Sequence, residues 1–351
     1  SLSIIMETTH NIIFNDSRNM GNIANESVDL IVTSPPYPMI EMWDDLFILQ
    51  NPQIKEALAS QNGTLAFNLM HEELSKVWSE CYRVLKKGGY ACINIGDTTR
   101  TIGSKFKLYP SHAKIVSSCT RIGFQSLPGI IWRKQTNSPT KFMGSGMLPA
   151  GAYVTLEHEY ILLFRKIGKR EFKTEEEKKN RKKSAIFWEE RNQWFSDVWS
   201  DIKGDRQSLS SDEIRSRSAA YPFDISARLI NMFSVQGDLI LDPYLGTGTT
   251  ILSAIASGRN SIGIELNESF GDHITQRIID ASDVLKNHSQ LRLQNHLDFV
   301  KMAEKNGKQF KHINTNYSFP VMTKQEIDLL LPTILKIHTE NHCLHTATYL
   351  D

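Results

Sequence analysis

The residue types best suited to chemistry lie in one short run near the start of the chain, residues 29–37. Its first part, Leu30–Val32, is apolar and largely β-branched, which predicts a buried strand. The strand is closed by Ser34, Pro35, Pro36 and Tyr37. Two prolines remove two backbone donors, so the carbonyls of Ser34 and Pro35 are free to face a ligand. A rigid carbonyl, a hydroxyl and an aromatic ring suit a nucleobase that carries an amino group. Taken alone, however, the run is more typical of a proline-rich turn.

A glycine-rich turn far downstream changes that balance. Residues 237–250 read Gly-Asp-Leu-Ile-Leu-Asp-Pro-Tyr-Leu-Gly-Thr-Gly-Thr-Thr, and residues 251–256 predict the start of a helix. Gly246 and Gly248 let the backbone turn tightly and approach a ligand closely. A second strand, Ser261–Glu265, ends in a carboxylate 17 residues after Gly248. In doubly wound nucleotide-binding folds, a carboxylate near that position holds a ribose diol.

Two departures argue against a dinucleotide at this turn. Ile251 stands where the third glycine of the dinucleotide motif would fall. Asp242 precedes the turn, where it would repel a pyrophosphate but attract a cation. The segment therefore predicts a ligand with an adenosine end and a positively charged amino-acid end, such as S-adenosylmethionine. The alternative is an ordinary strand–turn–helix with a packing glycine, because a glycine loop is a weak signal by itself.

Together the two motifs resemble those of the amino-methylating DNA methyltransferases, in the arrangement where the catalytic motif precedes the cofactor motif. In that family a Ser-Pro-Pro-Tyr or Asp-Pro-Pro-Tyr element carries catalysis, and an Asp-Pro-Phe-x-Gly-x-Gly element binds S-adenosylmethionine. Tyr244 replaces the phenylalanine here. Further segments resemble family elements in the expected order across residues 10–283: 15–17, 83–89, 130–134, 157–165 and 218–224.

The resemblance implies a fold, a cofactor and a set of site residues. The fold is a three-layer α/β Rossmann-like domain, with ligands at the carboxyl ends of a mostly parallel sheet. The implied cofactor is S-adenosyl-L-methionine. The implied catalytic residues are Ser34, Pro35, Pro36 and Tyr37. The implied cofactor-binding residues are Asp16, Thr33, Phe223, Asp242, Pro243, Tyr244, Gly246, Thr247, Gly248, Thr249 and Glu265.

Serine before the two prolines is the form usual in enzymes that methylate the N4 amino group of cytosine. The Ser34 hydroxyl and the Pro35 carbonyl would each accept an amino hydrogen, and the methyl group would move by direct displacement. The base must be flipped out of the duplex, with Tyr37 as its stacking surface. Methylation at carbon-5 needs a cysteine nucleophile, and none follows a proline in such a turn. No metal is expected, because a sulfonium is already an activated leaving group.

Three alternatives to cytosine-N4 methylation stay open. Adenine-N6 methylation is the nearest, because it uses the same fold and cofactor. An inactive relative that only binds nucleic acid is the second, although the intact motifs argue against it. Methylation of RNA or of a protein glutamine is the third, and an Asn-Pro-Pro-Tyr motif would suit it better than the serine found here.

Double-stranded DNA is the expected partner, although the net charge is only +1. Residues 165–183 hold ten Lys or Arg against four Glu. Such a run can track phosphates, and a solvated connector explains it equally well. Arginines in a polar stretch further on are candidate base readers. The candidate DNA-binding residues are Lys178, Lys179, Arg181, Lys182, Lys183, Arg206, Arg215 and Arg217.

Four segments are expected along the chain. Residues 1–165 form the catalytic half, 166–217 a target-recognition region, 218–283 the cofactor-binding half and 284–351 a helical C-terminal extension. Within the extension, residues 324–336 read as an amphipathic helix that could form a packing or homodimer surface. Six of the eleven histidines lie in this extension, where a helical cap is favoured over a metal site.

Composition places the chain among ordinary globular proteins, with 40% hydrophobic and 23% charged residues in 351. Four unpatterned cysteines indicate a reducing compartment. No stretch reaches the length of a membrane span and no signal peptide is evident. The expected location is the cytoplasm of a prokaryote, and the expected companion is a separately encoded restriction endonuclease.

Overall fold

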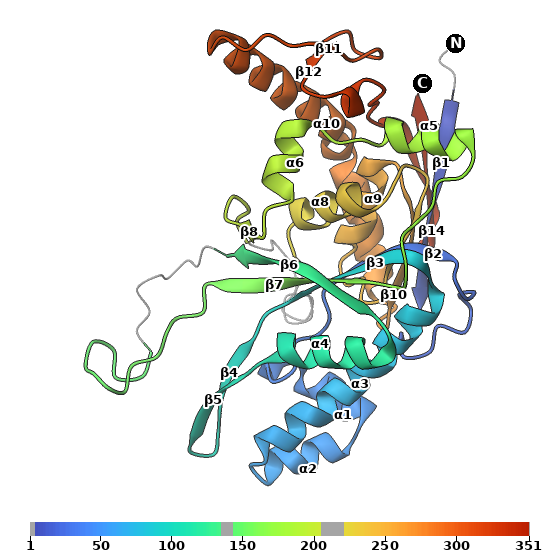
Figure 1. The fold of residues 1–351 in the computed structure, drawn as a ribbon. Coiled ribbons are helices and arrows are strands. Elements are labelled where there is room, and N and C mark those ends of the chain that lie inside the picture. Colours follow the sequence, from blue (N-terminus) through green and yellow to red (C-terminus); the bar gives the residue numbers. More distant parts are fainter. Residues whose placement is uncertain (1–3, 135–142, 205–220, 351) are drawn as a thin grey trace.

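The described residues build one mixed sheet with helices on both faces (Figure 1). The computed structural model describes residues 4–134, 143–204 and 221–350. Five strands run parallel at the centre of the sheet. In spatial order they are β1 (Ile4–Phe14), β10 (Asn260–Glu265), β9 (Leu239–Asp242), β2 (Val28–Thr33) and β3 (Leu85–Ile95).

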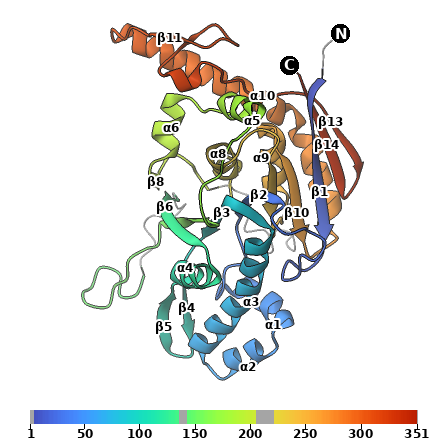
Figure 2. The ribbon, with the colours of Figure 1, turned by 45° about the vertical axis from the view of Figure 1, so that its right-hand side comes forward.

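Further strands extend the sheet on both sides of this parallel centre, mostly in antiparallel pairs. Next to β3 come β7 (His158–Arg165) and β6 (Gln125–Arg133), which pair antiparallel, and the short β8 (Val198–Trp199), which pairs in parallel with β6. Next to β1 come β14 (Leu344–Leu350) and β13 (Thr333–Asn341). Figure 2 shows this second group as one continuous edge of the sheet.

The two helical layers follow from the alternation of side chains along the buried strands. Ile31 faces the core under α3 (Gly63–Val84) and α4 (Ser111–Ile122). Leu30 and Val32 face the opposite core, which packs under α8 (Phe223–Phe233). The helices α9 (Thr249–Ser257) and α10 (Phe270–Lys305) enclose a third apolar cluster with β1 and the C-terminal strands. The predicted three-layer α/β fold is therefore confirmed.

Smaller elements surround the sheet. Between β2 and α3 lie the 3-10 turn η1 (Glu41–Trp43) and the short helices α1 (Asp44–Gln50) and α2 (Gln53–Ala59). A hairpin of β4 (Thr98–Ile102) and β5 (Lys105–Tyr109) projects after β3 (Figure 1). After β7 come α5 (Glu175–Lys183) and α6 (Trp188–Trp194).

The connections define where a ligand can bind. From the neighbouring strands β2 and β9, the chain continues to β3 on one side and to β10 on the other. Where connections diverge in this way, the carboxyl ends of the two strands leave a crevice between their loops. In this chain the crevice lies between the catalytic-type motif after β2 and the glycine turn after β9.

The C-terminal extension is not the helical segment that we expected. Its helical part belongs to α10, which begins before the extension, at Phe270. The chain then forms the short pair β11 (His312–Ile313) and β12 (Pro320–Val321), and β13 and β14 join the main sheet. Residues 324–336 hold only the 3-10 turn η2 (Lys324–Glu326) and the start of β13. Pro332 removes a backbone donor, and the β-branched residues after it favour a strand.

In the part of the chain that the structure describes, no helix combines the length and the apolar surface needed to cross a bilayer.

Candidate active site

The two motifs meet where β2 and β9 end side by side. The strands pair in parallel register, with Ile31 opposite Leu241. At their carboxyl ends, the Thr33 hydroxyl donates a hydrogen bond of 2.6 Å to Asp242 Oδ1. Two residues that are 209 positions apart in sequence are thereby joined in the buried core of the sheet.

A cavity of about 810 Å³ opens at this junction. Both Pro36 and Gly246 line it, as a shared site requires. Most of the residues predicted for the site contribute to its wall: Asp16, Ser34, Pro35, Pro36, Asp242, Pro243, Tyr244, Gly246, Thr247, Thr249 and Glu265. A volume of this size is in the range of sites for small molecules and cofactors.

Asp242 is the buried charge of the cavity wall, with 2% of its surface exposed. Besides the bond from Thr33, its carboxylate accepts hydrogen bonds from Thr250 Oγ1 at 2.6 Å and from the Tyr244 amide at 3.0 Å. Burial raises the pKa of Asp242 to about 6, against the lowering effect of these donors. The carboxylate is therefore mostly ionised at neutral pH and suited to a cationic group.

Glu265 ends β10 on the other side of the glycine turn. Its carboxylate accepts a hydrogen bond from the Gly246 amide at 2.9 Å and one from the Asn267 amide at 3.0 Å. Burial raises the pKa of this carboxyl group, and the two amide bonds oppose the rise. Each oxygen keeps a free lone-pair direction, so the carboxylate can accept further hydrogen bonds from a ligand diol.

The glycine turn has the backbone that the sequence predicts. Gly246 has a φ of +57°, and a Cβ built on it would meet nothing within 4 Å. Gly248 has a φ of +92° and caps α9, whose first turn therefore opens toward the cavity. Arg277 of α10 holds the turn by hydrogen bonds of 3.0 Å to the Thr247 and Thr249 hydroxyls.

Asp16 reaches the cavity from the loop after β1. Two oxygens of its carboxylate accept hydrogen bonds from the Arg18 guanidinium, at 2.7 Å from Nη2 and 3.1 Å from Nε. Arg18 in turn pairs with Glu73 of α3 at 2.7 Å. Burial would raise the pKa of Asp16, but the hydrogen bonds from Arg18 lower it. The carboxylate therefore stays ionised and fixed in direction.

The four residues of the proline-rich motif, Ser34–Tyr37, do not all line the cavity. Ser34 and the two prolines line the cavity, whereas Tyr37 is buried beside it with 8% of its surface exposed. The phenol oxygen of Tyr37 lies 3.4 Å from Ser34 Oγ and donates a hydrogen bond to the Glu159 carboxylate. Burial, with the Glu159 carboxylate second, raises the pKa of Tyr37 well above its ordinary value.

Other parts of the wall were not predicted from the sequence. Met42, Trp43 and Leu46 of η1 and α1 form an apolar side, and Leu266 follows Glu265. Tyr221 lines the cavity, and its hydroxyl pairs with Thr250 Oγ1. The position of Leu266 beside the strand-end carboxylate was an available signal, whereas no local pattern marks α1 as part of a site.

Three predicted cofactor residues lie outside the cavity wall. Thr33 and Gly248 act behind it, through Asp242 and the start of α9. Phe223 points into another cluster, where its ring packs edge-on against His288 at a centroid distance of 5.3 Å. Tyr221, two residues earlier, takes the place that we expected for Phe223.

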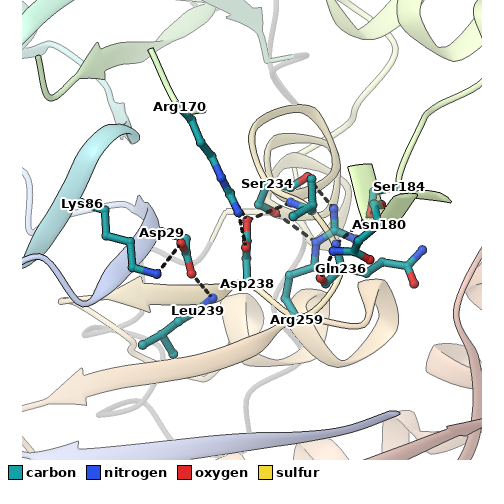
Figure 3. Close-up of polar contacts among 12 residues, drawn as sticks. Asp29, Lys86, Arg170, Asn180, Ser184, Ser234, Gln236, Asp238, Leu239 and Arg259 are labelled. Carbon is teal, nitrogen blue, oxygen red and sulfur yellow. Dashed lines mark hydrogen bonds and ion pairs between the residues drawn. The ribbon is translucent and has the colours of Figure 1, made fainter. Parts of the chain in front are cut away.

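The basic run lies at the opposite edge of the sheet from the cavity. Asn180 of α5 donates to the Gln236 carbonyl at 2.9 Å, just before the amino end of β9. Arg170 pairs with Asp238 at the same end (Figure 3). The predicted DNA-binding residues of α5, away from the cavity, are Lys178, Lys179, Arg181, Lys182 and Lys183. The other candidates, Arg206, Arg215 and Arg217, lie outside the described residues.

We also looked for a possible metal site. Within the residues that the structure describes, no three side chains of His, Cys, Asp or Glu are grouped so that they could share an ion.

Comparison with known proteins gives a consistent result. Residues 28–277 match the DNA methylase family of N6- and N4-amino methyltransferases. The chain is 54% identical over 327 residues to the type II methyltransferase M.MthZI of Methanothermobacter thermautotrophicus, covering 93% of this chain and 91% of the relative. It is 49% identical to M.MjaI of Methanocaldococcus jannaschii, covering 79% and 93%.

Solved structures agree at the level of the fold. A putative DNA modification methylase of Thermus thermophilus, solved with S-adenosyl-L-methionine, has a TM-score of 0.60 and 30% identity, covering 76% of this chain and 92% of that chain. The cytosine-N4-specific PvuII DNA methyltransferase has a TM-score of 0.52 at 14% identity, covering 80% and 93%.

A Rossmann-like sheet whose proline-rich motif and glycine turn share one cavity is the arrangement of an S-adenosylmethionine-dependent methyltransferase. With the family match over residues 28–277, the chain belongs to the N6/N4 DNA methylase family. The resemblance drawn from the sequence is thereby confirmed.

Proposed function

We propose that this protein is a site-specific DNA methyltransferase that moves a methyl group from S-adenosyl-L-methionine to the N4 amino group of a flipped-out cytosine. The observation that carries the proposal is the single cavity lined by Ser34 and Pro35 on one side and by Asp242 and Gly246 on the other. The related methylase solved with S-adenosyl-L-methionine supports the choice of cofactor.

The cofactor fits the donor set of this wall. Glu265 would hold the ribose diol, and the Asp242 carboxylate suits the positively charged end of the ligand. The amino-terminal turn of α9 has backbone donors and a partial positive charge that suit a carboxylate. Asp16 would provide a polar contact to the adenine, and Leu266 an apolar one. When bound, S-adenosylmethionine supplies a methyl group on a sulfonium, which is already activated for transfer.

The catalytic motif would prepare the attacking nitrogen. The lone pair of a cytosine amino group is delocalised into the ring, which makes it a poor nucleophile. Hydrogen bonds from its two hydrogens to Ser34 Oγ and the Pro35 carbonyl favour a pyramidal nitrogen with its lone pair exposed. Positioning and oriented dipoles then supply most of the acceleration, without a covalent enzyme intermediate. Tyr37, the last residue of the motif, is buried beside the cavity, so its stacking on the flipped base stays a prediction.

DNA would approach at the carboxyl edge of the sheet, where two arms project (Figure 1). One arm is the β4–β5 hairpin and the other is the segment of residues 143–157 between β6 and β7. Phe106 of the first stacks on Tyr153 of the second at a centroid distance of 4.4 Å. Lys105 and Lys107 are exposed on the hairpin, and Met147 and Leu148 on the second arm. The edge therefore offers positive charge and apolar surface beside the cavity.

The names of the relatives support a biological setting. Several are named as type II methyltransferases. We infer a restriction–modification role in a prokaryotic cytoplasm, with a separately encoded endonuclease as companion. A homodimer stays a prediction, which light scattering on the purified protein would test.

The experiment that tests the target atom is nucleoside analysis. Plasmid DNA is methylated with the purified protein and labelled cofactor, digested to nucleosides and separated by mass spectrometry. N4-methylcytosine is the expected product. Only N6-methyladenine would replace the proposal with its nearest alternative, and label in RNA or protein alone would remove DNA as the substrate. Absence of cofactor binding by calorimetry would favour an inactive nucleic-acid-binding relative.

A further inference from the structure

The catalytic-type tyrosine is held by a carboxylate–lysine pair that its own motif does not contain. The Tyr37 hydroxyl donates to Glu159 Oε1, and the other oxygen of that carboxylate lies 3.0 Å from Lys134 Nζ. Glu159 is the second residue of β7, and Lys134 directly follows β6. The pair therefore ties the carboxyl end of β6 and the amino end of β7 to the motif after β2.

The Tyr37 and Glu159 side chains are packed closely together. Glu159 and Tyr37 are 9% and 8% exposed. A Cβ on Gly96, at the end of β3, would lie 3.2 Å from the Tyr37 ring and 3.2 Å from Glu159 Cγ. The glycine therefore leaves room for both side chains. Lys134 Nζ lies 5.4 Å from the centroid of the Trp132 ring, which holds the counter-charge in place.

Hydrogen-bond chemistry fixes which group donates and which accepts along Ser34, Tyr37 and Glu159. An ionised carboxylate can only accept hydrogen bonds, so Glu159 requires the Tyr37 hydroxyl to donate to it. The phenol oxygen is then left as an acceptor, both for the Ser34 hydroxyl at 3.4 Å and for the Gly96 amide. With its proton directed at Tyr37, Ser34 turns oxygen lone pairs toward the cavity.

We propose that Glu159 is a positioning residue of the active site, whose carboxylate orients the Tyr37 and Ser34 hydroxyls so that Ser34 presents an acceptor to the target amino group. The inference rests on the proposed function and deepens it. It explains how a neutral serine, which could donate or accept, is committed to accept. Lys134 acts one step further away, because its ammonium group contacts the other Glu159 oxygen and holds the carboxylate in place.

The test is a double-mutant cycle on single-turnover methylation of cognate DNA, with Glu159→Gln, Tyr37→Phe and the double variant. Glutamine keeps the shape but can donate as well as accept, so Glu159→Gln should slow methyl transfer by about 10-fold to 100-fold. Tyr37→Phe removes the link between Glu159 and Ser34. In that background, Glu159→Gln should cost less than about twofold, because the two changes interrupt the same chain.

The matched control is Glu304→Gln, which removes an exposed carboxylate on α10 that does not line the cavity. This variant should methylate at the wild-type rate. Cofactor affinity, measured on all variants, should stay at the wild-type value, and each variant should show one cooperative thermal transition, which establishes that it is folded. Additive effects in the cycle, or a wild-type rate for Glu159→Gln, would overturn the proposal. A wild-type protein that methylates no DNA amino group would instead overturn the proposed function.

Lys134→Met provides a second arm that does not alter the hydroxyl chain directly. Losing the counter-charge should slow transfer by a smaller factor than Glu159→Gln, and the effect should also vanish in the Tyr37→Phe background. If Lys134→Met lowered DNA affinity without changing the single-turnover rate at saturating DNA, the lysine would be a DNA contact and this part of the proposal would fail.

Discussion

At the scale of single residues, the cavity combines a neutral catalytic motif with buried carboxylates. Ser34 carries no charge, whereas Asp242 and Glu265 lie within the wall with raised pKa values because they are buried. Their chemistry differs accordingly. Serine presents lone pairs at any physiological pH, while the carboxylates lose their attraction for a cation once they are protonated.

We expect the affinity for S-adenosylmethionine to depend on the ionisation of Asp242, whose pKa is about 6. The raised value means that the carboxylate is mostly charged above this pH and mostly neutral below it. The apparent Kd, measured by calorimetry from about pH 8 to about pH 5, should therefore rise as the pH falls through this range. Asp242→Asn should bind about tenfold more weakly at neutral pH and lose this step. Glu265→Gln, the control, should bind weakly but keep it.

Removing the Ser34 hydroxyl should affect transfer and not cofactor binding. Ser34→Ala leaves one amino hydrogen without its acceptor, so the single-turnover rate should fall by about 10-fold to 100-fold. The Kd for S-adenosylmethionine should be unchanged. Full activity of Ser34→Ala would contradict the role assigned to the hydroxyl, and Ser27→Ala, in the loop before β2, serves as a control for serine loss.

At the scale of elements, a segment can contact DNA near the active site only if it lies at the carboxyl end of the parallel strands, where the cavity opens. The strand β9 is four residues long, which corresponds to roughly 13 Å. The basic helix α5 and the cavity are separated by about the length of a strand, because one lies at the amino end of β9 and the other at its carboxyl end. The hairpin and the segment of residues 143–157 lie on the cavity side.

We therefore expect the hairpin lysines to matter more for DNA binding than α5. Lys105→Gln with Lys107→Gln should weaken binding and lower the slope of log Kd against log salt by about one for each phosphate that is no longer neutralised. The comparison is a variant with Lys178, Lys179 and Lys182 changed to Gln. An equal or larger decrease of the slope in the α5 variant would place DNA at the amino edge instead.

We expect the tip of the second arm, residues 143–157, to promote flipping of the target base. Met147 and Leu148 are 82% and 70% exposed, and the turn that carries them is closed by the Gly144–Ala152 bridge. Apolar side chains of this kind can wedge between base steps. Changing both to Ser should reduce the fluorescence rise of 2-aminopurine placed at the target position, with cofactor affinity unchanged. The same change at exposed Leu291 on α10 should have no effect.

At the scale of the whole molecule, the features that could be predicted from the sequence are those marked by a short local motif. The motif after β2 and the glycine turn each define their own backbone, so the shared cavity and the three-layer sheet followed from the sequence. The wall formed by Met42 and Trp43, the Glu159 contact and the position of α5 depend on long-range packing, which no local pattern encodes. The C-terminal hairpin was missed because its apolar spacing also fits a helix.

The C-terminal hairpin should be required for stability. Ala347 and Tyr349 of β14 are fully buried, and the Tyr349 hydroxyl donates to the Ile255 carbonyl of α9 at 2.7 Å. Truncation after Pro332 would expose this core and the edge of β1. The truncated protein should melt well below the full chain in a thermal scan and aggregate. Tyr349→Phe, which loses only the hydroxyl, should cost about 1 kcal/mol or more and remain folded.

The pairing of β14 with β1 has one more consequence. Ile4 lies opposite Leu350 in that ladder, so the first and last strands of the described chain are direct neighbours. A circularly permuted gene, with these strands joined by a short linker and new termini cut in the exposed surface turn at Gly168, would encode the glycine turn before the proline-rich motif. The same cavity would assemble, because it depends on which strands adjoin and not on the order of translation.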